Sequence, residues 1–134
     1  MTVDAIMSRD VETVAPDVTL MEIQEVLRKR GFRHLLVVED GALVGVISDR
    51  DVLRVISPFL DTLSESARDV KTLMRPASDV MRSDPVSASP DTSVEDAASM
   101  LLEHTISCLP VIGDDAQIQG IVTSKDLLRC LINQ

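Results

Sequence analysis

An internal repeat constrains the fold of this chain more than any other feature of its sequence. When the sequence is aligned with itself at an offset of 74 residues, identical residues coincide: Met7 with Met81, Asp10 with Asp84, Pro16 with Pro90, Leu27 with Leu101, and Leu35 with Leu109. One extra residue near Asp115 raises the offset to 75, and further positions then coincide: Gly45 with Gly120, and Asp51 with Asp126. Paired structural units tolerate an insertion that is confined to a turn. We therefore expect two similar units.

Each copy predicts the same order of secondary-structure elements. A short extended segment ends at a Pro-Asp pair. An amphipathic helix follows and begins with a capping box, Thr19-x-x-Glu22 in the first copy and Ser93-x-x-Asp96 in the second. Two apolar strands joined by a turn come next, and a second helix closes the copy. The strands are predicted at residues 35–38, 43–47, 109–112 and 118–122, and the closing helices at residues 49–56 and 124–132.

The repeat predicts an α+β fold of tandem β-α-β-β-α units. We assign residues 1–56 to the first repeat and residues 80–134 to the second. Because units of about 50 residues are too small to be stable alone, we expect their sheets to pack together with pseudo-twofold symmetry, as one module. Residues 57–79 contain Ser-Pro and Arg-Pro pairs but also apolar residues such as Phe59 and Leu63, so they predict an ordered, partly helical connector.

Composition and charge exclude several classes of partner. The 134 residues carry a net charge of −9, and aromatic residues make up only 1%. Binding to nucleic acid or to an anionic membrane through positive potential is therefore not expected, and neither is base stacking. The longest apolar runs are strand-sized, far short of the roughly 20 residues that span a bilayer. Cys108 and Cys130 are isolated, and no signal-peptide pattern is present, so we expect a cytoplasmic protein.

A second shared motif lies where each last strand meets its closing helix. Residues 45–51 and 120–126 both consist of Gly, two apolar residues, Ser or Thr, two variable residues and Asp. One interpretation is structural, since Ser or Thr three residues before Asp forms a capping box. The other is functional, because a helix N-terminus with a hydroxyl attracts an anion and a nearby carboxylate can accept hydrogen bonds from the two hydroxyls of a ribose. The adjacent cations, Arg50 and Lys125, fit a nearby phosphate better than they fit a cap.

With these motifs in order, the chain resembles a cystathionine-β-synthase (CBS) domain pair, also called a Bateman module. The resemblance runs from about Val3 to Asn133 and includes the Met and Pro-Asp positions, residues 109–112 (Leu-Pro-Val-Ile) and both Gly-to-Asp motifs. It implies two clefts that bind adenosine compounds such as AMP, ADP, ATP or S-adenosylmethionine as regulatory ligands, with no cofactor required.

The resemblance also implies roles for particular side chains. Asp51 and Asp126 would hold ribose hydroxyls, and Ser48 and Thr123 would lie near phosphate. Arg50 and Lys125 would reach toward the cleft of the other copy. The remaining candidates are the apolar residues around adenine and the basic residues before the Leu-Pro-Val strand position: Val46, Ile121, Val86, Arg33 and His34.

The second copy departs from the first at the basic positions. Ser107 and Cys108 replace Arg33 and His34. The two clefts are therefore expected to differ chemically. Few cations are available, which favours a monophosphate, occupancy of one cleft, or a phosphate-free ligand such as S-adenosylmethionine.

Catalysis and metal binding are not expected. His34, His104, Cys108 and Cys130 lack the tight spacing of a zinc site. The sequence also has no nucleophile in the context that a hydrolase requires. The prediction is a stand-alone regulatory module, not an enzyme, and the family resemblance implies that it forms a homodimer. The alternative is a ligand-free dimerisation or docking module for a partner enzyme or transporter.

Overall fold

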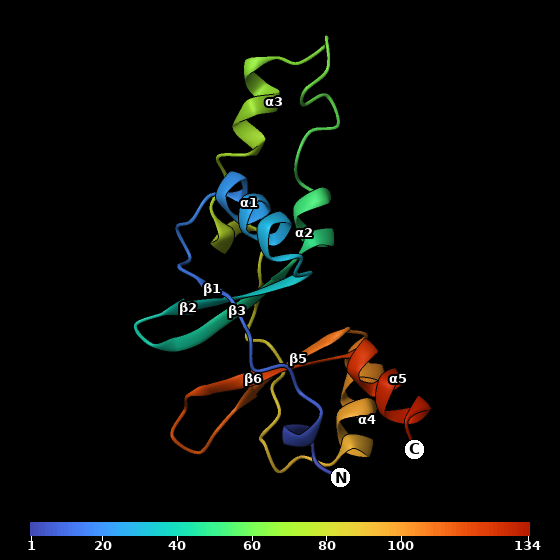
Figure 1. Ribbon diagram of the computed structural model, residues 1–134. Helices are drawn as coiled ribbons and strands as arrows, with labels where there is room; N and C mark the ends of the chain where they lie inside the picture. The colour runs from blue at the N-terminus through green and yellow to red at the C-terminus, as the bar shows by residue number, and fades with distance from the viewer. The chain divides into compact units, whose positions relative to one another are not determined.

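The computed structural model describes residues 1–134, and the chain divides into two compact units (Figure 1). We call Glu12–Ser83 the first-repeat unit, and Met1–Val11 together with Asp84–Gln134 the second-repeat unit. Both combine strands and helices, which confirms the predicted α+β class. None of the helices combines the length and the apolar character that a membrane span requires.

The first-repeat unit contains a four-stranded sheet in the order β1-β2-β3-β4. Strand β1 pairs with β2 in parallel, whereas β2 with β3 and β3 with β4 are antiparallel. The elements are β1 (Thr13–Val14), α1 (Leu20–Arg30), β2 (His34–Glu39), β3 (Ala42–Ser48), α2 (Asp49–Leu53), α3 (Ala67–Thr72), the 3-10 helix η2 (Ala77–Asp79) and β4 (Arg82–Ser83).

Helix α1 covers one face of this sheet, and α2 lies on the same side (Figure 1). The helix begins at the predicted cap, where the backbone N–H of Glu22 donates to Thr19 Oγ1 at 3.3 Å. It ends at Gly31, whose φ of +67° is a conformation that glycine adopts without strain. The buried core combines side chains of helix and sheet: Leu20, Ile23, Leu27, Leu35, Val37, Ile47, Val52 and Ala77.

The second-repeat unit has a two-stranded antiparallel sheet, β5-β6. Helices α4 and α5 pack against each other and against these strands (Figure 1). The elements are the 3-10 helix η1 (Val3–Ala5), α4 (Val94–His104), β5 (Cys108–Ile112), β6 (Ile118–Thr123) and α5 (Ser124–Ile132). Its core consists of Val3, Ala88, Ala97, Leu101, Leu109, Val111 and Val122.

The ends of corresponding helices differ between the units. Helix α4 ends at Thr105, which has a φ of +53° although it is β-branched, whereas α1 ends at Gly31. Helix α2 stops at Leu53 and is shorter than the predicted 49–56, because Val55 and Ile56 turn toward the core and a proline follows Ser57. Helix α5 spans the predicted residues.

The unit boundaries differ from the repeat boundaries expected from the sequence, 1–56 and 80–134. Met1–Val11 packs with the second repeat, and the connector and β4 pack with the first. In each unit the packed segment passes close to a glycine of a strand. A Cβ on Gly120 would lie 2.5 Å from the carbonyl oxygen of Ser8, and one on Gly45 would lie 3.1 Å from that of Arg82. The backbone approach at Gly120 is too close for a Cβ atom, whereas the approach at Gly45 would require a small shift of the neighbouring backbone.

Candidate functional site

The sheet of each unit has a second face, opposite its own helices, which we call the helix-free face. In the first-repeat unit Leu35, Val37 and Ile47 point into the core. Because side chains alternate along a strand, their neighbours point the other way. The register places His34 opposite Ser48 and Val46 opposite Arg82. These four side chains therefore share the helix-free face.

The second-repeat unit has a corresponding set of side chains. Leu109, Val111 and Val122 belong to its core. Cys108 lies opposite Thr123, and Ser8 forms a bridge with Ile121. The helix-free face of this unit therefore carries Cys108, Thr123, Ile121 and Ser8.

At the junction of β3 and α2 the structure has a complete capping box. The backbone N–H of Asp51 donates to Ser48 Oγ at 3.1 Å, and the backbone N–H of Ser48 donates to Asp51 Oδ2 at 2.9 Å. Asp51 is 7% exposed, and its Oδ1 lies 3.7 Å from Nη1 of Arg54. The structural interpretation of this motif is therefore confirmed.

The junction of β6 and α5 repeats the arrangement. The backbone N–H of Thr123 donates to Asp126 Oδ2 at 2.8 Å, and that of Asp126 donates to Thr123 Oγ1 at 3.4 Å. Arg129 donates from Nη1 to Asp126 Oδ1 at 3.3 Å. Two carboxylate oxygens together accept about four hydrogen bonds. Capping therefore leaves both aspartates able to accept further hydrogen bonds.

The other predicted site residues are divided between the two units. Arg33 and Arg50 are exposed in the first-repeat unit, just before β2 and in the first turn of α2. Lys125 is exposed in the first turn of α5. Val86 is half-buried and packs against the core of the second-repeat unit, which does not include Ile121.

His34 lies among charged groups. Burial lowers the pKa of His34 from its ordinary value of 6.5, Asp49 and Asp51 oppose that shift, and Arg33 and Arg82 add to it. Arg82 was not among the residues predicted from the sequence. The repeat itself held the signal, because Arg82 aligns with Ser8 and so marks a difference between the copies.

Cys108 occupies the position of His34 in the second-repeat unit. Burial, with a smaller effect of Asp126, raises the pKa of its thiol to about 12. It is therefore an uncharged side chain at neutral pH. No group of three or more His, Cys, Asp or Glu side chains is arranged to hold a metal ion.

A pocket of about 400 Å³ lies within the second-repeat unit, between the N-terminal segment and α5. Asp126 is the one predicted site residue on its wall. The lining residues are Met1, Ala5, Ile6, Asp126, Arg129, Cys130, Asn133 and Gln134.

Comparison with known proteins identifies the repeat. Residues 3–58 and 77–133 each match the family model of the CBS domain. This chain belongs to the CBS domain family. Its two repeats form a CBS domain pair, as the sequence motifs predicted.

Relatives and solved structures agree with this assignment. The CBS domain-containing protein YhcV of Bacillus subtilis is 35% identical over 121 residues, which cover 90% of this chain and 79% of YhcV. The Methanocaldococcus jannaschii protein MJ1225 is 27% identical over 130 residues, which cover 95% of this chain. The chain spans about half of MJ1225, 46% of its length.

Two similar structures are CBS pairs with bound ligands. The CBS domain pair of protein MJ0100, in complex with 5′-methylthioadenosine and S-adenosylmethionine, has a TM-score of 0.82 and 25% identity, covering 99% of this chain and 97% of that one. The structure of CBSX2 in complex with AMP has a TM-score of 0.79 and 30% identity, covering 98% and 96%.

Proposed function

We propose that this CBS domain pair is a regulatory module that binds an adenosine compound and signals through conformation or association. The observation that carries the proposal is its likeness, over nearly the whole chain, to CBS pairs in complex with AMP and with S-adenosylmethionine and 5′-methylthioadenosine. The repeated hydroxyl-and-carboxylate pair supports it, because both junctions hold a carboxylate and a hydroxyl side by side, and such groups suit a ribose and a phosphate.

The residues take the roles that the family resemblance implies. Asp51 and Asp126 accept hydrogen bonds from ribose hydroxyls, and Ser48 and Thr123 lie near phosphate. The cations and the apolar residues that bound the nucleoside complete the set: Arg33, His34, Arg50, Lys125, Val46, Ile121 and Val86. The role is regulatory and not catalytic. We place the protein in the cytoplasm, where its two free cysteines stay reduced.

Signalling requires that the ligand prefer one arrangement of the protein over another. The helices offer a surface for association, because α5 has no buried residue although it carries several leucines. Its Leu128, Leu131 and Ile132 are each more than half exposed, and so is Leu53 at the end of α2. We propose that a second copy of the chain covers these side chains in a homodimer.

The same exposed helices support an alternative function. In it, both aspartates serve only as caps, and the pair binds a partner enzyme or transporter without a ligand. The alternative predicts that no adenosine compound stabilises the protein.

A thermal-shift series distinguishes the two functions. The purified protein, shown to be free of co-purified nucleotide, is heated with AMP, ADP, ATP, S-adenosylmethionine, NAD or GMP. A ligand at about 100 times its Kd adds roughly 2.7 kcal/mol, which raises the Tm by several degrees. A shift confined to adenosine compounds supports the sensor. The absence of any shift supports the docking module.

Aspartate variants then test the ribose contact. Asp51→Ala and Asp126→Ala each remove the carboxylate of a capping box and leave its N-cap residue, Ser48 or Thr123, in place. The loss should not exceed the about 0.5–2 kcal/mol of an N-cap, so the fold is retained. The stabilisation by nucleotide should disappear in at least one of them. If both variants respond to ligand like the parent, the ribose assignment is wrong.

A further inference from the structure

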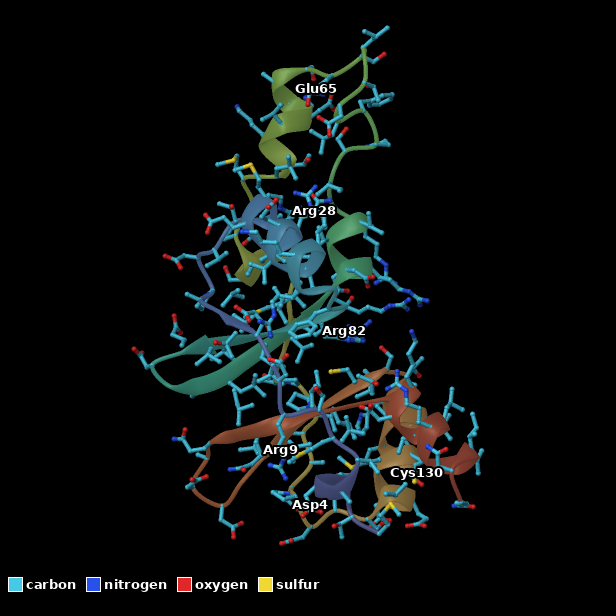
Figure 2. The ribbon with its side chains drawn as sticks, viewed as in Figure 1. Asp4, Arg9, Arg28, Glu65, Arg82 and Cys130 are labelled. Carbon is cyan, nitrogen blue, oxygen red and sulfur yellow. The ribbon has the colours of Figure 1, made fainter.

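Most of the connector lies outside the core of the first-repeat unit. Helix α3 has no buried residue, and residues 61–68 are all exposed. The helix extends away from α1 (Figure 1), and Glu65 lies near its far end (Figure 2). The side chains of Phe59, Leu63 and Met74 are each more than half exposed. Apolar packing therefore does not explain how this part of the connector is held in one arrangement.

A cluster of polar side chains around Asp69 closes the connector. The hydroxyl of Ser57 donates to Asp69 Oδ1 at 2.7 Å, and the backbone N–H of Ser57 donates to Thr72 Oγ1 at 3.0 Å. The hydroxyl of Thr72 donates to the carbonyl oxygen of Asp69 at 2.6 Å. The second carboxylate oxygen, Asp69 Oδ2, accepts from the backbone N–H of Ser66 at 2.8 Å and from its hydroxyl at 3.0 Å. The carboxylate thus joins the first residue of the connector to α3.

The two bonds from Ser57 are the only hydrogen bonds that join residues 57–65 to α3. The other bonds of this stretch close local turns within it. The hydrogen bond from Ser57 is also the largest of the effects that lower the pKa of Asp69 from its ordinary value of 3.8. Asp69 is therefore charged at neutral pH, and a charged acceptor makes the stronger kind of hydrogen bond.

Contacts on both sides limit the segment that can open. Directly before Ser57, the side chain of Ile56 packs against the core. After α3, the backbone N–H groups of Met21 and Leu20 in α1 donate to the carbonyl oxygens of Leu73 and Arg75, at 3.0 and 2.9 Å. Segments with few buried apolar contacts and exposed hydrogen bonds open locally, without global unfolding. Local opening is therefore confined to residues 57–72.

We infer that Ser57 and Asp69 form a latch that holds residues 57–72 closed, and that its release opens this segment while the rest of the first-repeat unit stays folded. In the open state the segment is a flexible loop that carries Phe59, Leu63 and Val70. A negative charge added at Ser57 releases the latch, because it repels the Asp69 carboxylate. The latch is independent of the proposed function, since neither residue belongs to the candidate ligand site.

Amide hydrogen exchange, followed residue by residue by NMR, tests the latch in the parent chain and in S57A, S57D and D69N. The reporter is the amide at position 57, which donates to Thr72 Oγ1. Its exchange, corrected for the intrinsic rate, should be about tenfold faster in S57A and D69N, as expected for the loss of one hydrogen bond to a charged group. The asparagine of D69N has one accepting oxygen where the carboxylate has two. S57D should exchange fastest.

Two variants in the same connector are matched controls. The hydroxyl of Ser64 and the carboxylate of Asp61 form no hydrogen bond, and only their backbone N–H groups do. S64A and D61N should therefore exchange like the parent at position 57. The amides of Leu20 and Met21 report on the boundary of the segment, and they should keep the parent's rates in every variant.

Three results would overturn the inference. Exchange like that of the parent in S57A, S57D and D69N would show that this contact does not hold the connector. Faster exchange at Leu20 and Met21 as well would mean that the opening spreads into α1. In the double variant S57A/D69N, a latch predicts exchange no faster than in the more open single variant, so additive effects would show that Ser57 and Asp69 act separately.

Discussion

The two units of this chain share their framework and differ at their surface chemistry. Both have the same capping box at the junction of the last strand and the closing helix, with the aspartate oxygen near an arginine three residues later. They differ at residues on the helix-free face beside that junction. The first-repeat unit has His34 and Arg82 there, whereas the second-repeat unit has Cys108 and Ser8. The shared motif therefore caps the closing helix in both repeats, whereas the unshared side chains give each helix-free face a different charge.

The largest expected effect concerns Gly120 and Gly45, each of which another segment of the chain passes at close range. Gly120→Ala should cost about 1–3 kcal/mol, because its Cβ would meet the Ser8 backbone and the N-terminal segment would have to move. Gly45→Ala should cost less, because its Cβ first meets the flexible side chain of Met81. Urea unfolding of both variants measures the difference. Equal losses would show that the two crossings are energetically alike.

A smaller effect concerns the ends of the long helices. Thr105→Gly should stabilise the protein by about 0.5–1 kcal/mol, because it relieves a β-branched residue at a φ of +53°. The converse change, Gly31→Thr, should destabilise it by a similar amount, because Gly31 has a φ of +67°. Both residues are exposed, so packing changes little. The Tm of each variant provides the measurement, and a shift of the same sign in both would contradict the argument.

The smallest effect is a dependence of stability on pH near 6.5, which His34 of the first-repeat unit should produce. The pKa of His34 is lowered in the folded state, so the unfolded chain binds more protons just below pH 6.5. The contribution of His34 to stability is therefore present above about pH 6.5 and is lost as the pH falls below that value. His34→Cys, which introduces the residue of the second repeat, should reduce this slope. Urea unfolding from pH 5 to 7.5 checks it, and an unchanged slope would exclude His34 as the source.

Much of the fold could be predicted from the repeat. Capping signals and apolar periodicity act locally, and they predicted the helix starts at Thr19, Ser93 and Thr123. Of these, only Thr123 forms a complete capping box, because at Thr19 and Ser93 only the N-cap side chain accepts its hydrogen bond. The early end of α2 at Leu53 could not be predicted in the same way, because it depends on the packing of Val55 and Ile56 in three dimensions.

The candidate site was predicted less completely than the fold. The repeated motif directed attention to Ser48, Asp51 and their counterparts, whose capping geometry the structure bears out. Arg82 was not predicted as a neighbour of these residues, because its position beside Val46 depends on the register between β3 and β4. The order of residues along the chain does not show which of them become neighbours on paired strands.

Met1–Val11 packs with the second repeat, and this affects the order in which the two units fold during synthesis. Residues 12–83 are continuous in the chain, so the first-repeat unit can fold as soon as it has left the ribosome. The second-repeat unit cannot, because Ser8 must pair with Ile121 across almost the whole length of the chain. The N-terminal segment is synthesised first but can pair only after β6 has been synthesised. The long loop between them therefore closes late in folding.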